Sequence, residues 1–402
     1  MSRLPPALRP LWPVVKRGHR ALTRTVGAVG RRVPTAPDRA LPRRGTVLAA
    51  EAAAAEPARV RIRVGSPAFE LVRTPAQGTP PGMAFFDEVT DYAVPPRFVL
   101  EIDDGRLVGE HAATVTPGGI LEWETSHYFG TRTWREHPLY LRPRLPAERR
   151  VEGTVLSLVS HGSARNYFHL ITDLAPRWGI AQEALPGLEP DHVVVNTDWP
   201  AHREILHLLG IDRYPLIQPD RAMNLRADRL LVPGLHGFRG LAPPWVTDWL
   251  RDQLPADRTQ GRPRRLYVTR GEVPNSRRMV HERGVVEVLE QRGFTRFDPM
   301  GWTVQEQIDH FAAAEAVVAP HGAALTNLTF CPTGVRVLEM FAPTYLNPAF
   351  WAITANIPDS VYRYLVADPV DLARPERRMN GLMTDIALTP AQVAAAVDAL
   401  LA

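Results

Sequence analysis

The amino-acid sequence predicts an α/β fold in two domains, each built on a parallel sheet. From Val151 onward, short apolar runs alternate with segments of helical periodicity, which is typical of parallel strands joined by crossover helices. The chain has 402 residues, more than the ~250–300 that one hydrophobic core serves. A Pro- and Arg-rich stretch at 255–265 separates two such sets of elements. We therefore expect an N-terminal domain over 46–255 and a C-terminal domain over 256–402.

Residues 1–45 differ in charge from the rest of the chain. They hold eleven Lys and Arg residues and one acid, Asp38, which leaves 36 basic and 42 acidic residues in the remainder, a net charge of −6. We expect a disordered tail here. The stretch WPVVKRGHRALTRTVGAV could instead form a short basic amphipathic helix at an anionic membrane surface. The acidic remainder argues against a nucleic-acid-binding face.

The sequence places few constraints on compartment. Cys331 is the only cysteine, so an internal disulfide and a cysteine-based zinc site are excluded. Its neighbours Phe330 and Pro332 predict a buried, inert thiol. Basic residues interrupt the N-terminal apolar stretch, and no apolar run reaches the ~18 residues of a spanning helix. We expect a cytoplasmic protein, peripheral to the inner membrane face if the tail binds lipid.

Residues 58–130 are expected to form β-structure that leads into the N-terminal domain. The run ARVRIRV alternates as a half-buried strand does. Asp104-Gly105 stands between two apolar runs and predicts a hairpin, as does Pro117-Gly118-Gly119 further on.

Strands and helices then alternate through the first domain. Strands are expected at 153–160, 192–196 and 229–234, and helices at 166–178 and 201–210, the second of which stops at Gly210.

The second domain repeats the alternation. Strands are expected at 265–270, 316–320 and 335–340, with helices at 281–294 and 303–315. Thr303 and Glu306 form a capping box, and Thr389 with Pro390 predicts the start of a final helix.

Polar residues mark the predicted ligand edge of the second sheet. His321 and Gly322 follow the strand VVA, and Glu339 falls near the carboxyl end of the next strand, where parallel sheets bind ligands. Free N–H groups after Gly322 could hold a diphosphate, and Glu339 could accept hydrogen bonds from ribose hydroxyls. Arg270 ends a strand at the same edge, and Arg277 and Arg278 follow it. The alternative is a packed βαβ unit with His321 bonded to a loop.

The first domain offers a candidate general base. His169 and Asp173 stand four residues apart, on one face of the predicted helix. A histidine beside a carboxylate suits proton abstraction, although a surface pair or a satisfied core histidine would have the same spacing.

Three stretches together resemble glycosyltransferase family 61. They are NYFHLITDLAPRW (166–178), LYVTRGEVPNSRRMVHERGVVEVLEQRGF (266–294) and VVAPHGAALTNLTFCPTGVRVLEM (317–340). The resemblance implies a GT-B fold, in which two Rossmann-like domains face an active site between them. It also implies metal-independent, inverting transfer from a nucleotide sugar, usually a UDP-sugar. His281 and Ala324 depart from the family pattern, which commonly has Asn and Gly there.

The resemblance carries functional roles onto particular residues. It assigns Asn166, His169 and Asp173 to the acceptor side of the active site. It assigns to the donor-binding side Arg270, Arg278, Glu282, His321, Gly322, Thr326, Asn327 and Glu339. Of the base candidates, Asp173 is favoured slightly, with His169 orienting the acceptor.

The sequence therefore predicts an inverting glycosyltransferase of surface-polysaccharide assembly that acts on a glycan or lipid-linked acceptor. No cofactor is expected, and no metal, because the Asp103-Asp104 pair belongs to a predicted turn and arginines can neutralise the leaving diphosphate. The alternatives are a pyruvyl or phosphosugar transferase of exopolysaccharide assembly and a non-catalytic glycan-binding scaffold.

Overall fold

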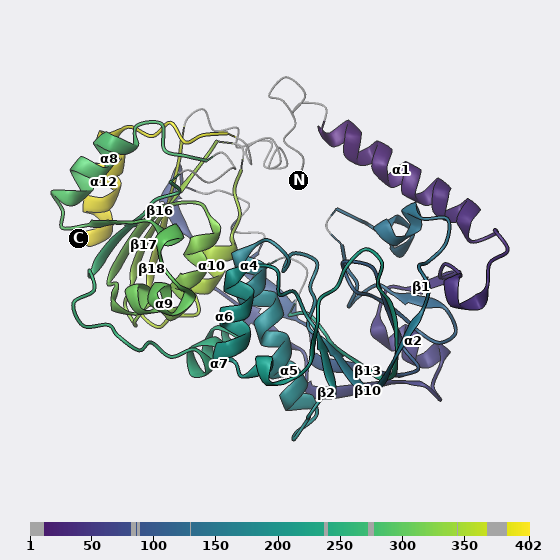
Figure 1. The fold of residues 1–402 in the computed structure, drawn as a ribbon. Helices are drawn as coiled ribbons and strands as arrows, with labels where there is room; N and C mark the ends of the chain where they lie inside the picture. The colour runs from purple at the N-terminus through teal and green to yellow at the C-terminus, as the bar shows by residue number, and fades with distance from the viewer. Residues whose placement is uncertain are drawn as a thin grey trace. The chain divides into compact units, whose positions relative to one another are not determined.

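The computed structural model describes residues 12–81, 86, 89–128, 130–236, 240–271, 277–343, 345–367 and 384–402 (Figure 1). The chain forms two compact units. Unit 1 comprises Met1–Ala68 and Pro95–His236, and unit 2 comprises Phe69–Val94 and Gly237–Ala402. The division differs from the predicted boundary at 255/256, and it assigns residues 69–94, expected in the N-terminal domain, to unit 2.

Residues 12–45 are not a structureless tail, which corrects our expectation for them; residues 1–11 lie outside the described part. Helix α1 (Trp12–Gly30) packs on the short helices η3 (Trp134–Glu136) and η4 (Pro138–Leu141) of unit 1. Gly27 lies directly against Tyr140, and Arg24 forms an ion pair with the buried Glu136. These partners stand more than a hundred residues away in the chain, so local composition could not indicate them.

A ten-stranded mixed sheet forms the centre of unit 1. Strands β12, β11, β10 and β13 lie side by side and are parallel. In sequence order this part reads 3-2-1-4, the order of half a doubly wound sheet. Its strands are β1 (Arg44–Thr46), β2 (Val60–Ser66), β6 (Arg97–Asp103), β7 (Arg106–Val108), β8 (Ala113–Val115), β9 (Ile120–Glu122), β10 (Arg149–Ser157), β11 (His192–Val194), β12 (Leu216–Ile217) and β13 (Asn224–Pro233).

One of the two predicted hairpins is wrong. Strands β6 and β7 both pair antiparallel with β13 rather than with each other, so Asp104-Gly105 interrupts one long edge instead of reversing it. Asp104 takes a positive φ of 56°, and its N–H bonds to Asp228, which keeps the strand beside β13. The second hairpin is confirmed: β8 and β9 pair antiparallel across Pro117-Gly118-Gly119, where Gly119 has a φ of 76°.

Helices pack on this sheet. The helix that follows β10 runs through α4 (Tyr167–His169), a π-helical turn (Leu170–Leu174) and α5 (Ala175–Ala184). Apolar residues of α2 and of the strands form one core, which includes Ala52, Leu100, Val155 and Leu230. The remaining helices of unit 1 are α2 (Ala49–Ala55), η2 (Pro37–Arg39), α6 (Pro200–Leu208) and η6 (Ile211–Arg213).

Unit 2 contains a six-stranded sheet in which all pairs are parallel. Its order is β15-β14-β16-β17-β18-β4, so β14 is the strand at which the chain changes direction across the sheet. The strands are β4 (Gln77–Thr79), β14 (Arg265–Val268), β15 (Thr295–Phe297), β16 (Ala316–Pro320), β17 (Arg336–Phe341) and β18 (Val361–Val366), and β3 (Phe69–Val72) pairs with β5 (Asp91–Val94) in a separate ribbon.

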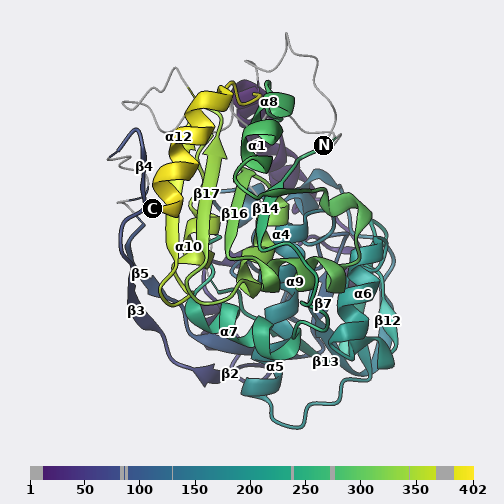
Figure 2. The ribbon, with the colours of Figure 1, turned by 90° about the vertical axis from the view of Figure 1, so that its left-hand side faces the viewer.

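Helices cover both faces of the unit 2 sheet. Figure 2 shows α8 and α12 side by side over one face, and their buried residues join the strands in one core. Figure 1 shows α9 and α10 on the opposite face. The helices are α7 (Pro244–Gln253), α8 (Glu282–Glu290), η7 (Pro299–Gly301), α9 (Val304–Ala313), η8 (Ala323–Phe330), α10 (Ala349–Thr354) and α12 (Pro390–Leu401).

Several local predictions in unit 2 are confirmed. Thr303 and Thr389 cap α9 and α12 as expected. Cys331 is fully buried, and burial raises the pKa of its thiol, as expected for an inert residue. None of the helices in the described residues is both long and apolar enough to cross a membrane.

Candidate functional site

Unit 1 gathers ionisable side chains where β10 and β13 end. His161 follows β10, His236 follows β13, and His169 and Asp173 lie on the helix after β10. These two strands flank the point where the strand order of the parallel part reverses, which is where doubly wound sheets bind ligands. Asn166, predicted to be on the acceptor side, is the N-cap of this helix and accepts a hydrogen bond from the N–H of Phe168.

The predicted pair is formed. Nδ1 of His169 donates to Oδ2 of Asp173 over 2.7 Å, and Nε2 of His236 donates to the other oxygen over 3.2 Å. Burial alone would raise the pKa of Asp173, but the two histidines hold it well below its usual value. Asp173 is therefore an ionised, buried carboxylate, and His236 is a partner that the sequence did not indicate.

The bond to Asp173 fixes the tautomer of His169. An ionised carboxylate only accepts, so Nδ1 carries the proton and Nε2 of the neutral ring is the nitrogen that can take one up. Gly162 lies against this ring: a Cβ on Gly162 would stand 2.3 Å from Cδ2 of His169. Any larger residue there would displace the histidine.

A third histidine, His161, lies beside the His169–Asp173 pair. The rings of His161 and His169 have centroids 5.1 Å apart, and burial lowers the pKa of His161 to about 4. Potential ligand atoms of His161, His169 and Asp173 lie within 4.8 Å of one another, a spacing that could hold a metal ion. Such an ion would have to compete with the His169–Asp173 hydrogen bond, because both groups already use a ligand atom in it.

Arg177 links the ends of the two strands that position this cluster. Arg177 is 1% exposed, and its guanidinium donates to the carbonyls of Val159 and Pro233, next to the carboxyl ends of β10 and β13. Burial lowers the pKa of Arg177 to about 10, so it stays charged at neutral pH. Sequence reasoning missed this role, although Arg177 belongs to the quoted stretch 166–178.

Unit 2 also places polar residues at a change in strand order. Arg270 follows β14, and His321 and Gly322 follow β16, the strand beside it. Nη1 of Arg270 donates to the carbonyl of His321 over 3.0 Å. A Cβ on Gly322 would stand 2.3 Å from the same Nη1, so glycine is needed for the close approach of the guanidinium.

Glu339 lies behind His321 and not at a surface where a ribose could reach it, which corrects that prediction. The carboxyl group is fully buried; one oxygen bonds to Nδ1 of His321 and the other accepts from Tyr362 over 2.6 Å. Burial raises the pKa of Glu339 to about 8, despite the Tyr362 hydrogen bond. Burial and the charges of Arg277 and Arg270 keep the pKa of His321 well below its usual value.

Arg277, rather than the predicted Arg278, is the second arginine of this cluster. Its side chain is 8% exposed and stacks 5.0 Å from the ring centroid of Tyr345, whereas Arg278 is exposed. Arg277 adopts a φ of 79°, a strained conformation for a residue with a Cβ. The backbone N–H groups of Arg277 and Arg278 both donate to Asp385, which holds this turn in place.

Two positive charges, the buried Arg277 and the partly buried Arg270, are thus close together. Burial, and to a smaller extent repulsion by Arg277, lowers the pKa of Arg270 to about 10. Burial also lowers the pKa of Arg277. Nε of each arginine is buried without a hydrogen-bond partner among the described residues. Such a pair would be stabilised by a bound anion.

The other residues predicted to bind the sugar donor form hydrogen bonds within unit 2. Glu282, at the start of α8, accepts hydrogen bonds from Tyr267 and Thr269 at the end of β14. Thr326 is fully buried and donates to the carbonyl of Ala323, and Asn327 donates to Gln307. The segment after Gly322 is a 3-10 helix, Ala323–Phe330.

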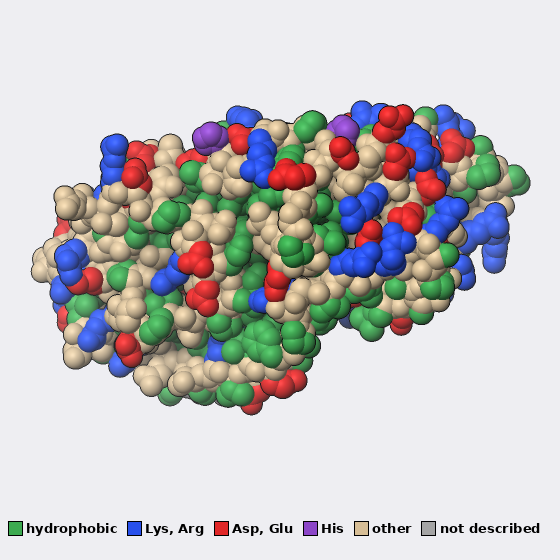
Figure 3. Space-filling view, turned by 90° about the horizontal axis from the view of Figure 1, so that it is seen from below, with side chains coloured by type: hydrophobic (Ala, Val, Ile, Leu, Met, Phe, Trp, Pro, Cys, Tyr) green, Lys and Arg blue, Asp and Glu red, His purple; other side chains and the backbone are tan. Residues whose placement is uncertain are grey.

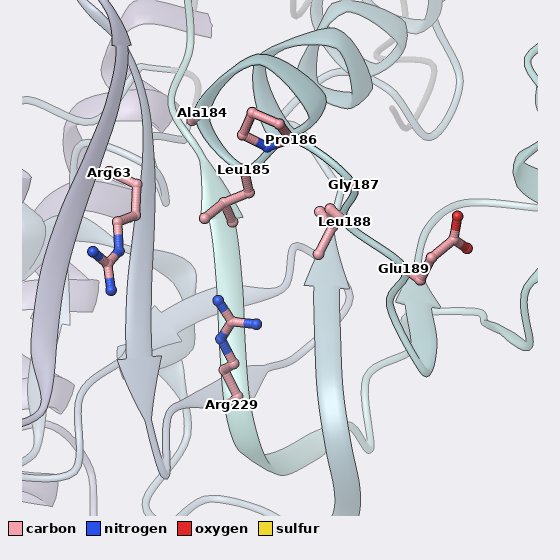
Figure 4. Close-up of a pocket in the computed structure, with 8 residues that line it drawn as sticks. All are labelled: Arg63, Ala184, Leu185, Pro186, Gly187, Leu188, Glu189 and Arg229. Atoms are coloured by element: carbon pink, nitrogen blue, oxygen red, sulfur yellow. The ribbon is translucent and has the colours of Figure 1, made fainter.

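A cavity of about 520 Å³ in unit 1 contains none of the predicted residues. Figure 4 shows the residues that line it, Arg63, Arg229 and the segment 184–189, which begins at the last residue of α5. Both arginines donate through Nε to the buried Glu101. Figure 3 shows basic and acidic side chains gathered over this side of the sheet, where they neutralise one another.

Comparison with known proteins gives one family. The family model Glycosyltransferase 61 matches residues 167–338, less than half of the chain. The match spans the helix with His169 and Asp173 and the strand end with His321. No curated protein matches the chain. The family match supports the assignment to glycosyltransferase family 61, and it identifies the protein as a glycosyltransferase.

Proposed function

We propose that the protein is an inverting glycosyltransferase that takes a sugar from a nucleoside diphosphate sugar, with UDP as the first candidate nucleotide. The acceptor would be a hydroxyl of a glycan or lipid-linked acceptor of surface polysaccharide. One observation carries the proposal: two arginines, the buried Arg277 and the partly buried Arg270, lie beside His321 at the carboxyl edge of a doubly wound sheet. The parallel sheet of unit 2 and the parallel part of the unit 1 sheet, both with polar residues at strand ends, also support a GT-B assignment.

The arginines suit a leaving diphosphate. Their charges are costly in the free protein because both groups are wholly or partly withdrawn from water and repel each other. Negative charge grows on the diphosphate as the glycosidic bond breaks, so preorganised cationic donors bind the transition state better than the ground state. This arrangement needs no metal ion, and we propose that none is required.

His321 is suited to donate to the same anion. The raised pKa of Glu339 and the lowered pKa of His321 favour a pair without net charge at neutral pH. A neutral pair holds two protons, one between Nδ1 and the carboxyl group and the other on Nε2. Nε2 of His321 can then donate a hydrogen bond to a phosphate oxygen without the burial of an extra charge.

In unit 1 the geometry favours His169 as the base, in place of Asp173. Both oxygens of Asp173 accept hydrogen bonds, and its lowered pKa makes the carboxylate a weak base. Nε2 of His169 can accept the proton, while Asp173 holds the ring and stabilises the imidazolium that forms.

The proposed reaction is a single displacement. The acceptor oxygen bonds to the anomeric carbon as its proton passes to Nε2 of His169. The bond from that carbon to the phosphate oxygen breaks, and its electron pair leaves on the nucleoside diphosphate. Attack opposite the leaving group inverts the anomeric centre.

Binding of nucleotides tests the proposal. Melting temperatures would be measured with a panel of nucleoside diphosphates and nucleotide sugars, each with EDTA and with Mn²⁺. We expect one nucleoside diphosphate to stabilise the protein equally in both, and its sugar derivative to be a donor. Binding that disappears in EDTA would overturn metal independence. Stabilisation by phosphoenolpyruvate alone would favour pyruvyl transfer, and stabilisation by glycans alone would favour a scaffold.

A further inference from the structure

We propose that helix α1 binds the surface of an anionic lipid bilayer. One face of the helix is fixed to unit 1: Thr23 is fully buried, Gly27 and Gly30 lie against Tyr140 and Leu41, and Arg24 pairs with Glu136. The helix is therefore held on a folded unit, and another side of it stays exposed.

An apolar stripe runs along the exposed side of the helix. Val15, Leu22 and Val29 are 47%, 55% and 59% exposed, and their spacing of seven residues places them along one line of an α-helix. Val14, 61% exposed, lies beside them. Of the fourteen large hydrophobic residues exposed in the described chain, four lie on α1. Such a concentration marks an interaction surface, whereas single exposed hydrophobic residues do not.

Charge identifies the partner. The helix has no acidic residue and carries Lys16, Arg17, Arg20 and Arg24. Residues 1–45 hold eleven of the basic residues and one acid, while the remainder of the chain has a net charge of −6. A second copy of the chain would bring an equally basic helix to the contact and be repelled. An anionic membrane surface attracts the net positive charge of this end of the chain and takes up the apolar stripe.

The helix would lie in the plane of the interface. Arg17 is exposed next to the edge of the apolar face that carries Val14, and its long side chain can reach the headgroups while the valines and Leu22 enter the acyl boundary. Unit 1, to which α1 is attached, would be held at the membrane. This binding requires no particular donor or acceptor, so it can hold or fail independently of the proposed transfer reaction.

Vesicle sedimentation without nucleotide tests the proposal. The full chain would be mixed with vesicles of phosphatidylcholine alone or with phosphatidylserine added, at low and high salt. We expect sedimentation with the anionic vesicles that weakens at high salt. The double variant Leu22→Glu, Val29→Glu should lower the partition coefficient by at least about tenfold, because two apolar side chains no longer enter the membrane.

A matched control separates this effect from general changes of the surface. Val64 and Val280 are 59% and 56% exposed and lie outside α1, so Val64→Glu, Val280→Glu adds the same charge to other sites. The control should sediment like wild type, and both variants should melt like it. Equal sedimentation of both variants would overturn the proposal. Self-association that only the α1 variant abolishes would overturn it too, in favour of a second copy as the partner.

Discussion

Replacement of Arg277 by Met should weaken diphosphate binding without lowering the stability of the free protein. Methionine keeps much of the length of the side chain and removes its charge. In the free protein, burial lowers the pKa of Arg277, so the charged guanidinium is held there at a cost. Loss of the stacking on Tyr345 opposes the gain from removing the charge. We therefore expect an unchanged or slightly higher melting temperature.

The expected effect on binding follows from the position of the guanidinium. Arg277 is 8% exposed, and its Nε has no hydrogen-bond partner among the described residues. A hydrogen bond to a charged group contributes about 1.5–3 kcal/mol, so the dissociation constant of the nucleoside diphosphate should rise about 10- to 150-fold.

The neighbouring Arg278 provides the control. Its side chain is exposed, and its backbone N–H, which donates to Asp385, is unaffected by Arg278→Met. Isothermal titration of wild type and both variants with the best-binding nucleoside diphosphate gives the three constants. Equal losses in the two variants would refute the assignment of Arg277 as the buried ligand, and so would unchanged binding in Arg277→Met.

Three further predictions concern the His169–Asp173 cluster of unit 1 and the Arg270–His321 cluster of unit 2. Asp173→Asn should lower kcat about 10²–10⁴-fold with donor affinity intact, because His169 loses its fixed tautomer, and a smaller loss in His169→Gln would instead favour Asp173 as the base. Gly322→Ala should weaken nucleotide binding, since a Cβ would stand 2.3 Å from Nη1 of Arg270, and wild-type titration curves would contradict this. Because the folded protein retains the Glu339 proton up to a pKa of about 8, its stability should fall as pH rises from 4.5 through about 8. The stability of Glu339→Gln, which has no proton to lose at this position, should fall less over the same range. If the melting temperatures of the two proteins change in parallel between pH 5 and pH 9, this linkage is excluded.

Features set by neighbours in the chain were predictable from the sequence. The helix period alone brings His169 within reach of Asp173, four residues on, and Thr303 and Thr389 cap helices whose first turns follow them directly. The alternation of strands and helices after Val151 likewise indicates parallel sheets, because such strands need crossover connections. The resemblance to the family also rests on contiguous motifs, and the match over 167–338 supports it.

Tertiary packing decided what lies around those residues. His236 contacts Asp173 only because β13 ends beside β10. Helix α1 packs on residues that lie more than a hundred positions away in the chain. Residue type and spacing could not show which of Arg277 and Arg278 would turn inward, since that depends on the turn held by Asp385. Glu339 has the position of a ligand-binding carboxylate in the sequence, but His321 and Tyr362 enclose it. Burial and long-range partners decide whether each side chain is charged and whether a ligand can contact it. Burial and such partners arise only when distant segments of the chain pack together.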